Sequence, residues 1–211
     1  MIKPRVLDVV IPGAGRVGRA SATLVWVAIA LVLADVIAYR AILGGQGGPP
    51  PDSVAVVPFV GVYMLLMAAL LGLSLLGNAR VARLRPAMLA ASAAGLLLLG
   101  FFALFSIGLP LSVAGILSAI AAVRSLSGRN GRSAVLSEVA GAVIALMVLV
   151  GGFEVTQSII VCPPTGTMAG SSSGFLTGPY HYRCDNGTLT WFAGDCNGVT
   201  PNGNPLSANG C

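Results

Sequence analysis

Charged residues are scarce in this sequence. Only 9% of the 211 residues are Asp, Glu, Lys or Arg, a single residue is histidine, and 55% are hydrophobic. A soluble globular protein needs a charged exterior, so this composition excludes a soluble domain. The shortage of His, Asp and Glu also leaves few groups for acid–base catalysis or for holding a metal. The composition therefore predicts a non-enzymatic protein without a cofactor.

Cysteine is absent from the first 161 residues, and no Cys-x-x-Cys motif occurs anywhere. The four cysteines lie together in the C-terminal segment: Cys162, Cys184, Cys196 and Cys211. The missing motif argues against a thiol oxidoreductase, and the wide spacing argues against a zinc site. An even number of cysteines in a short polar segment is typical of structural disulfides in an oxidising compartment. We predict two disulfides and favour Cys162–Cys184 with Cys196–Cys211, while the other two pairings remain open.

Long apolar runs are what the sequence has in abundance, and each has a length that suits a membrane-spanning helix. Five of them occur, at about residues 22–39, 54–76, 87–107, 109–124 and 135–154. The fourth run is short and is either a full span or half of a hairpin that dips into the bilayer. The sequence predicts an all-α integral membrane protein with a five-helix transmembrane bundle. A basic leader (residues 1–21) precedes the bundle, and a small disulfide-bonded β-hairpin domain (residues 155–211) follows it.

Basic residues fall almost entirely on one side of these runs. Ten of the twelve lie before the first run, between the second and third, or between the fourth and fifth; the others are Arg40 and Arg183. Cytoplasmic loops accumulate Lys and Arg, so we expect the N-terminus inside and the C-terminal segment outside a plasma membrane. The same rule explains the net charge of +5, which therefore does not indicate nucleic-acid binding. Eleven of the twelve basic residues are arginine, a bias typical of GC-rich bacterial genomes.

Small residues recur at four-residue spacing on three of the runs. The rows are Ala87, Ala91 and Gly95; Ala114, Ser118 and Ala122; and Ser137, Gly141 and Ala145. Such rows let helix backbones approach closely in lipid, where no hydrophobic effect drives helix association. They predict packing within one bundle, which we favour, or a face for homo-oligomerisation.

Two short motifs match enzyme patterns but lie in the wrong context. Gly13, Gly15 and Gly18 form a G-x-G-x-x-G pattern, yet the helix expected after them is apolar all round and leaves no room for a βαβ unit. Residues 170–174 form a G-x-S-x-G pattern within a Gly/Ser-rich stretch. We interpret that stretch as a flexible linker and not as a nucleophile elbow. Neither motif predicts an active site.

Two acidic residues stand out in the apolar runs. Asp35 lies in the outer half of the first run, and Glu154 lies at the outer end of the fifth. A charge within a bilayer is costly, so such residues are candidates for a function. The functional interpretation is an outward-facing cation or proton site that uses both acids. The ordinary interpretation, which we favour, pairs Asp35 with Arg40 or a hydroxyl group and places Glu154 among headgroup water.

The C-terminal segment contains one strong local signal. Asn186 and Gly187 separate two stretches of β-prone residues and predict a type I′ hairpin, because both residues tolerate a positive φ. The hairpin carries Tyr180, His181, Tyr182, Trp191 and Phe192. An isolated hairpin is barely stable in water, so we expect these side chains to form a miniature core held by disulfides. A partner-binding surface is the alternative.

Together these features predict a multi-pass membrane protein that acts as a non-enzymatic accessory or scaffold subunit. It would pack against a larger membrane complex in the lipid bilayer or present its disulfide-bonded domain to an envelope partner. The alternative is a small transporter or channel subunit with an acidic site at Asp35 and Glu154. That alternative predicts a water-filled cavity, open outward, between the first and fifth helices.

Overall fold

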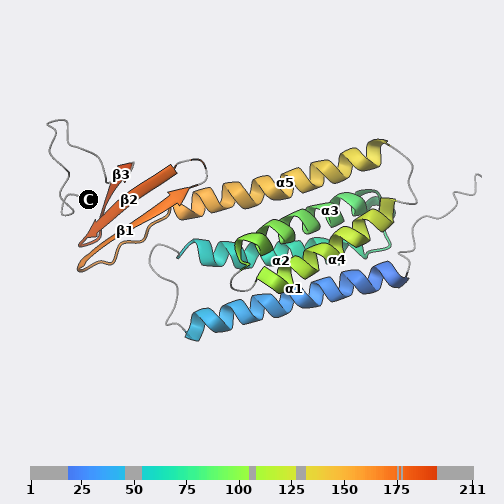
Figure 1. Ribbon diagram of the computed structural model, residues 1–211, viewed down its shortest axis with the longest axis horizontal. Coiled ribbons are helices and arrows are strands. Elements are labelled where there is room, and N and C mark those ends of the chain that lie inside the picture. Colours follow the sequence, from blue (N-terminus) through green and yellow to red (C-terminus); the bar gives the residue numbers. More distant parts are fainter. Residues whose placement is uncertain are drawn as a thin grey trace, which may run out of the picture.

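The computed structural model describes residues 19–45, 54–104, 108–126, 132–174, 176 and 178–193. Within these residues the chain forms five helices followed by a small sheet (Figure 1). The helices are α1 (Arg19–Gly45), α2 (Val56–Ser74), α3 (Ala79–Phe102), α4 (Gly108–Leu126) and α5 (Arg132–Gln157). Most of the predicted basic leader, residues 1–18, lies outside the described residues.

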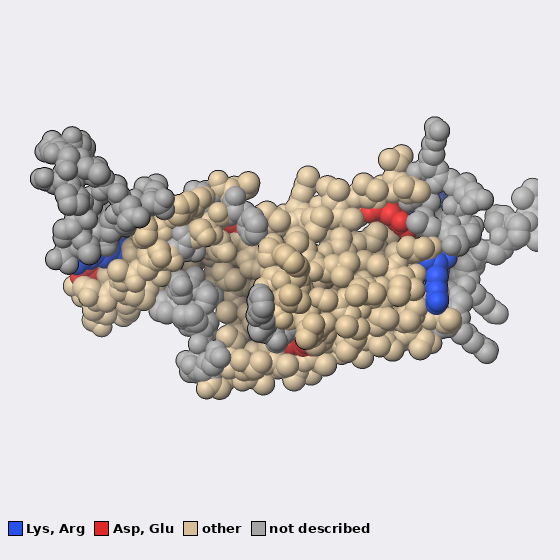
Figure 2. All heavy atoms as spheres, viewed as in Figure 1, with Lys and Arg blue, Asp and Glu red and all other residues tan. Residues whose placement is uncertain are grey.

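All five helices are long and apolar enough to cross a membrane, as the sequence predicts. Their apolar stretches range from 18 residues in α4 to 26 in α1, or roughly 27–39 Å, and a bilayer has a hydrocarbon core of about 30 Å. Helix α4 has 19 residues, as many as α2, so the short fourth run has the length of a full span. Figure 2 shows mainly uncharged side chains over the visible face of the helices.

Helix α3 begins and ends earlier than the sequence analysis predicts. It extends over Ala79–Phe102 instead of residues 87–107, and Pro86 lies inside it. Residues 79–86, which we expected as a polar loop, therefore form its first two turns. This boundary was wrong because we placed it at the start of the apolar run, and the helix begins before that run. The arginines before it are good helix formers, which offsets the one backbone hydrogen bond that proline cannot make.

Arg85 shows that these basic residues also have a structural role. Its guanidinium group donates hydrogen bonds to the carbonyl oxygens of Ser74 and Leu76, at 2.7 and 3.2 Å. The last carbonyls of a helix have no partner within the helix and carry a partial negative charge. Arg85 therefore caps the C-terminal end of α2 as well as contributing positive charge to this end of the bundle.

Helix α3 lies at the centre of the bundle and α5 at its edge. α3 packs against α2, α4 and α5, whereas α1 packs against α2 and α4. Half of the apolar stretch of α3 is buried within the protein, compared with 11% of that of α5. Helices α1 and α5 lie on opposite sides of the bundle (Figure 1). Helix α5 is thus attached to the other helices along one face only.

The small-residue rows are used for packing within the chain. Ala114, Ser118 and Ala122 on α4 are all buried. Gly141 on α5 approaches α3 so closely that a Cβ atom there would overlap the carbonyl oxygen of Ala87. Such contact between backbones is what small residues permit in a membrane bundle. The rows on α4 and α5 therefore bring these helices against their neighbours in the same chain.

Tyr63 joins three helices in the interior of the bundle. Its side chain on α2 is 1% exposed, and its hydroxyl group donates a hydrogen bond to the carbonyl oxygen of Ala145 on α5 at 3.0 Å. The ring lies over Gly95 of α3, where a Cβ atom would overlap the tyrosine hydroxyl. Buried tyrosines usually find such a partner for the O–H group. Helix α5 is thus held by a polar contact as well as by close packing.

The sheet has three antiparallel strands in the order β1-β2-β3. They are β1 (Thr167–Gly174), β2 (Gly178–Asp185) and β3 (Thr188–Ala193). The predicted hairpin is confirmed: Asp185 pairs with Thr188 across the two-residue turn. Asn186 and Gly187 in that turn have φ values of 47° and 84°, as a type I′ turn requires.

Strand β1 corrects the prediction of a flexible linker. The Gly/Ser-rich residues 170–174 pair with β2 along their whole length, so the domain is a three-stranded sheet and not a hairpin alone. Gly170 lies opposite Tyr182, and a Cβ atom at Gly170 would overlap the tyrosine ring. An aromatic side chain that covers a glycine on the neighbouring strand offsets the weak intrinsic preference of glycine for a strand. Composition alone did not indicate this compensation.

Candidate functional site

The candidate site is the joint between α5 and the sheet, and its core comes from one face of β2. Tyr180, Tyr182 and Cys184 alternate along this strand and are 3%, 5% and 0% exposed. Successive residues of a strand point to opposite faces, so this spacing places all three on the same side. Ile160, Cys162 and Met168 pack against them. The sheet therefore has the miniature core that we favoured over an aromatic binding surface.

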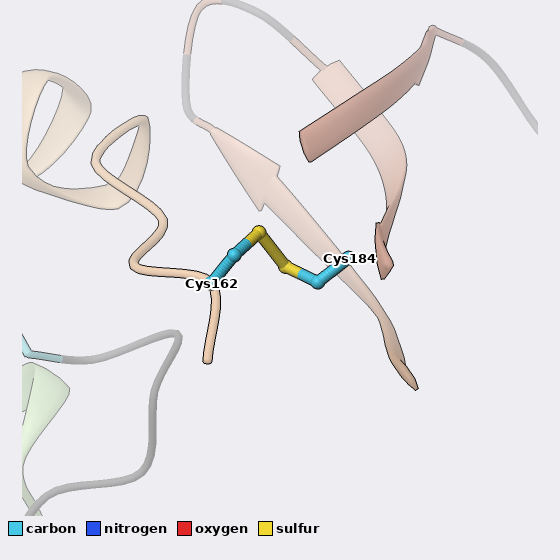
Figure 3. The surroundings of a disulfide bond; sticks show 2 residues. All are labelled: Cys162 and Cys184. Carbon is cyan, nitrogen blue, oxygen red and sulfur yellow. A yellow bond between two sulfur atoms is a disulfide. The ribbon is translucent and has the colours of Figure 1, made fainter. Parts of the chain in front are cut away.

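A disulfide connects Cys162, in the segment that follows α5, to Cys184 on β2 (Figure 3). The Cα atoms are 5.4 Å apart, within the usual range for such a bond. This is one of the two pairs that we favoured from the sequence. Cys196 and Cys211 lie outside the described residues, so their pairing remains a prediction.

Two hydrogen bonds attach the sheet directly to the end of α5. The hydroxyl group of Tyr180 donates to the carbonyl oxygen of Gln157 at 2.6 Å. The backbone amide of Leu176, between β1 and β2, donates to Oε2 of Glu154 at 3.3 Å. Glu154 therefore positions the sheet, a role that the sequence analysis missed when it placed this carboxylate among headgroup water. Together with the disulfide, these bonds join the sheet at three points to α5 and to the segment that directly follows it.

The turn at the far end of the sheet is fixed by its own contacts. The backbone amide of Asn186 donates to the carbonyl oxygen of Gly166 at 3.0 Å. The amide of Gly166 donates in return to Oδ1 of Asn186 at 3.1 Å. This reciprocal pair ties the β2–β3 turn to the start of β1, so the end of the sheet away from the helices is ordered and exposed.

The predicted partner-binding aromatics do not form one exposed group. Tyr180 and Tyr182 are buried, while His181, which lies between them on β2, is partly exposed. Trp191 and Phe192 pair with Tyr182 and His181 across the ladder, but their side chains lie outside what the structure describes. The exposed residues of β2 are instead Pro179, Arg183 and Asp185, none of which is aromatic.

Asp35 lies in the buried stripe of α1 together with Ala28 and Val32, and it is 4% exposed. Its Oδ2 atom has no hydrogen-bond partner among the described residues. The pairing that we favoured, with Arg40 or a hydroxyl group, is thus not present at this oxygen. The guanidinium group of Arg40 lies instead beside Gly61 of α2, with Nη2 3.6 Å from the position of a Cβ atom.

The structure does not bring Asp35 and Glu154 together. Asp35 belongs to α1 and Glu154 to α5, and these helices lie on opposite sides of the bundle (Figure 1). Glu154 is hydrogen-bonded to Leu176 of the sheet, whereas Asp35 is enclosed by the helices. A joint acidic site between the first and fifth helices therefore does not form.

Glu138 is an acid within an apolar helix that the sequence analysis missed. It lies near the start of the apolar stretch Val135–Gln157 of α5, and its Oε1 atom is buried with no hydrogen-bond partner among the described residues. The sequence analysis considered only the two acids in the outer halves of the runs, Asp35 and Glu154. An acid four residues into an apolar run was a readable signal, since any charge at membrane depth needs a reason.

Comparison of the chain with protein-family models, with curated proteins and with solved structures finds no match. The proposals below therefore follow from the residues and the geometry alone.

Proposed function

We propose that this chain is a multi-pass plasma-membrane protein whose helices hold a small disulfide-closed sheet on the extracytoplasmic side as a docking element for a membrane or envelope partner. It acts as a non-enzymatic accessory or scaffold subunit. The observation that carries the proposal is the three-point joint at Cys162–Cys184, Tyr180–Gln157 and Glu154–Leu176. A sheet held this firmly to one helix has a fixed orientation, which recognition by a partner needs.

The distribution of charge supports the orientation. The start of α1, the α2–α3 connection, the end of α4 and the start of α5 share the end of the bundle opposite the sheet (Figure 1). In the sequence, ten of the twelve basic residues fall before or at the start of α1, between α2 and the first two turns of α3, or between the end of α4 and the start of α5. Cytoplasmic segments accumulate Lys and Arg, so this end belongs in the cytoplasm. The disulfide agrees with a sheet in an oxidising compartment outside it.

Labelling of introduced cysteines in intact cells tests the orientation. We expect a cysteine at Ser127 to resist a membrane-impermeant thiol reagent, and one at Gln46 to react with it. The unsubstituted chain is the blank, because its native cysteines are expected to be oxidised. Reaction at Ser127 from outside the cell would contradict the assignment from the arginines.

Photo-crosslinking in living cells tests the docking role. A photoreactive residue at Asp185 or Thr188, in the exposed far end of the sheet, should form a discrete protein adduct. The matched control is Ile144, which is 61% exposed on α5 and should crosslink mainly to lipid. The adduct should disappear in the double variant Cys162→Ala/Cys184→Ala, which releases the sheet from α5. Failure to form any protein adduct from the sheet would contradict the proposal.

A second candidate function rests on Asp35 alone. A buried carboxylate whose Oδ2 atom has no hydrogen-bond partner among the described residues, in the outer half of α1, is what a proton or monovalent cation site would contain. The protein reconstituted in liposomes with an imposed proton or sodium gradient would then show flux that Asp35→Asn abolishes. Equal leakage from liposomes with and without the protein would remove this candidate.

A further inference from the structure

Leu176 is the most exposed of the large apolar side chains in the described part of the chain, with 80% of its surface accessible. It lies between β1 and β2, where a soluble sheet would carry a polar turn residue. One exposed leucine needs no explanation in itself. What distinguishes Leu176 is its position relative to the helices.

The hydrogen bond to Glu154 fixes the depth of Leu176. Its backbone amide donates to the Glu154 carboxylate at 3.3 Å, and Glu154 lies three residues before the end of the apolar stretch Val135–Gln157. At 1.5 Å per residue, Glu154 is about 12 Å from the middle of this stretch, compared with about 15 Å for half of the hydrocarbon core. Leu176 is thus held at the depth where acyl chains meet headgroups.

Other exposed apolar side chains occur at the end of α5 and in the segment that follows it, near Glu154 in the sequence. Val155, next to Glu154, is 62% exposed, and Ile159 and Val161 are 46% and 49% exposed. Figure 1 shows the β1–β2 end of the sheet beside the end of α5, with the other end extending away from the helices. The end of the sheet that carries Leu176 therefore lies near the end of α5 that carries the exposed Val155.

We propose that Leu176 is a lipid anchor, whose side chain inserts at the boundary between acyl chains and headgroups in the leaflet on the sheet side. The proposal rests on the membrane location given above. Aliphatic side chains at this boundary gain from leaving water. The anchor holds one end of the sheet on the bilayer, so the turn at Asn186 stands roughly 25 Å farther out, the length of an eight-residue strand.

Depth-dependent fluorescence quenching tests this anchor. The full chain, with a single introduced cysteine that carries an environment-sensitive dye, is reconstituted in phosphatidylcholine vesicles. Leu176→Cys is the test position. Val155→Cys on α5 is the control for a lipid environment, and Thr188→Cys at the far end of the sheet is the control for water. Quenching is measured with a doxyl-labelled lipid and, separately, with iodide in the aqueous phase.

We expect the dye at position 176 to be quenched by the doxyl lipid within about a factor of two of the dye at position 155, and at least about threefold more than the dye at position 188. In Glu154→Ala, which removes the acceptor for the Leu176 amide, the dye at 176 should become accessible to iodide. A dye at 176 that behaves like the one at 188 would overturn the anchor. Protection from both quenchers would also overturn it and would indicate a second copy or a protein partner.

The control on α5 separates this inference from the proposed function. If the dye at Val155 is also quenched by iodide and not by the doxyl lipid, the membrane location itself fails. If the dye at Val155 is in lipid and the dye at Leu176 is in water, only the anchor fails.

Discussion

Removal of the Cys162–Cys184 disulfide should release the sheet while leaving the helices folded. The bond closes a loop with a sequence separation of 22 residues, for which chain entropy gives a stabilisation of about 3 kcal/mol. The noncovalent core that remains is small, since Tyr180 and Tyr182 supply its main buried area. We expect this loss to exceed what the sheet can tolerate, because domains with so few buried residues depend on their crosslinks.

Hydrogen exchange of the double variant Cys162→Ala/Cys184→Ala in detergent micelles is the measurement. A loss of 3 kcal/mol corresponds to a roughly 100-fold fall in amide protection over residues 167–193. Protection in the helices should not change, because their backbone bonds lie within each helix and in a lipid-like environment. The matched control is Thr190→Ala, an exposed position on β3, which should leave protection intact. Unchanged protection of the strands in the double variant would refute the reasoning and assign the stability to the hydrogen bonds with α5.

Three further predictions concern the helices, each read from unfolding of the purified protein in mixed micelles. Gly141→Ala should cost about 1–3 kcal/mol, because its Cβ atom would overlap the Ala87 backbone, which cannot move aside. Gly151→Ala, with nothing within 4 Å, should be neutral or gain up to about 1 kcal/mol; equal stability of the two variants would contradict the α3–α5 packing. Tyr63→Phe should cost about 0.6–1.7 kcal/mol through loss of one buried hydrogen bond. If the stability stays the same, that hydrogen bond does not stabilise the bundle. Asp35→Leu should raise stability by about 1–3 kcal/mol, since a buried carboxylate oxygen without a hydrogen-bond partner, as Oδ2 is among the described residues, is costly. A loss of stability would mean that the carboxylate makes a stabilising contact.

The sequence predicts the helices better than it predicts the sheet, for physical reasons. A bilayer requires about 20 consecutive apolar residues, a signal that survives even the short fourth run. Helix ends are harder to read from the sequence, because arginines occur both in loops and in helical turns. We therefore placed the start of α3 after Pro86, whereas the helix begins at Ala79. The turn at Asn186 and Gly187 was readable because few residues tolerate positive φ. Strand β1 was not readable, because the residue that compensates for Gly170 is Tyr182 on the neighbouring strand. Tyr182 pairs with Gly170 but lies 12 positions farther along the sequence.

The candidate site was likewise predicted from the sequence only in part. Sequence reasoning found the residues that compose the joint, including Cys162, Cys184, Tyr180 and Glu154. It gave the disulfide and the core role of Tyr180 correctly, but it did not predict that Glu154 accepts a hydrogen bond from the sheet. Whether an aromatic residue is buried or exposed depends on which face of β2 it occupies, and that face is set by pairing with β1. Burial of Glu138 and the position of Asp35 likewise depend on which helices are neighbours, and composition does not encode this arrangement.

The single-face attachment of α5 has a consequence for assembly. During synthesis the first four helices are complete before α5 appears, and the surface that later receives it is already lined by Ala87, Phe59 and Tyr63. A helix that docks on a preformed surface need not be covalently joined to it, as two-stage association of membrane helices implies. Residues 1–131 and 132–211, expressed as separate polypeptides, should therefore recombine in the membrane. Helix α5 and the sheet would then form one unit that can be replaced while the first four helices stay unchanged.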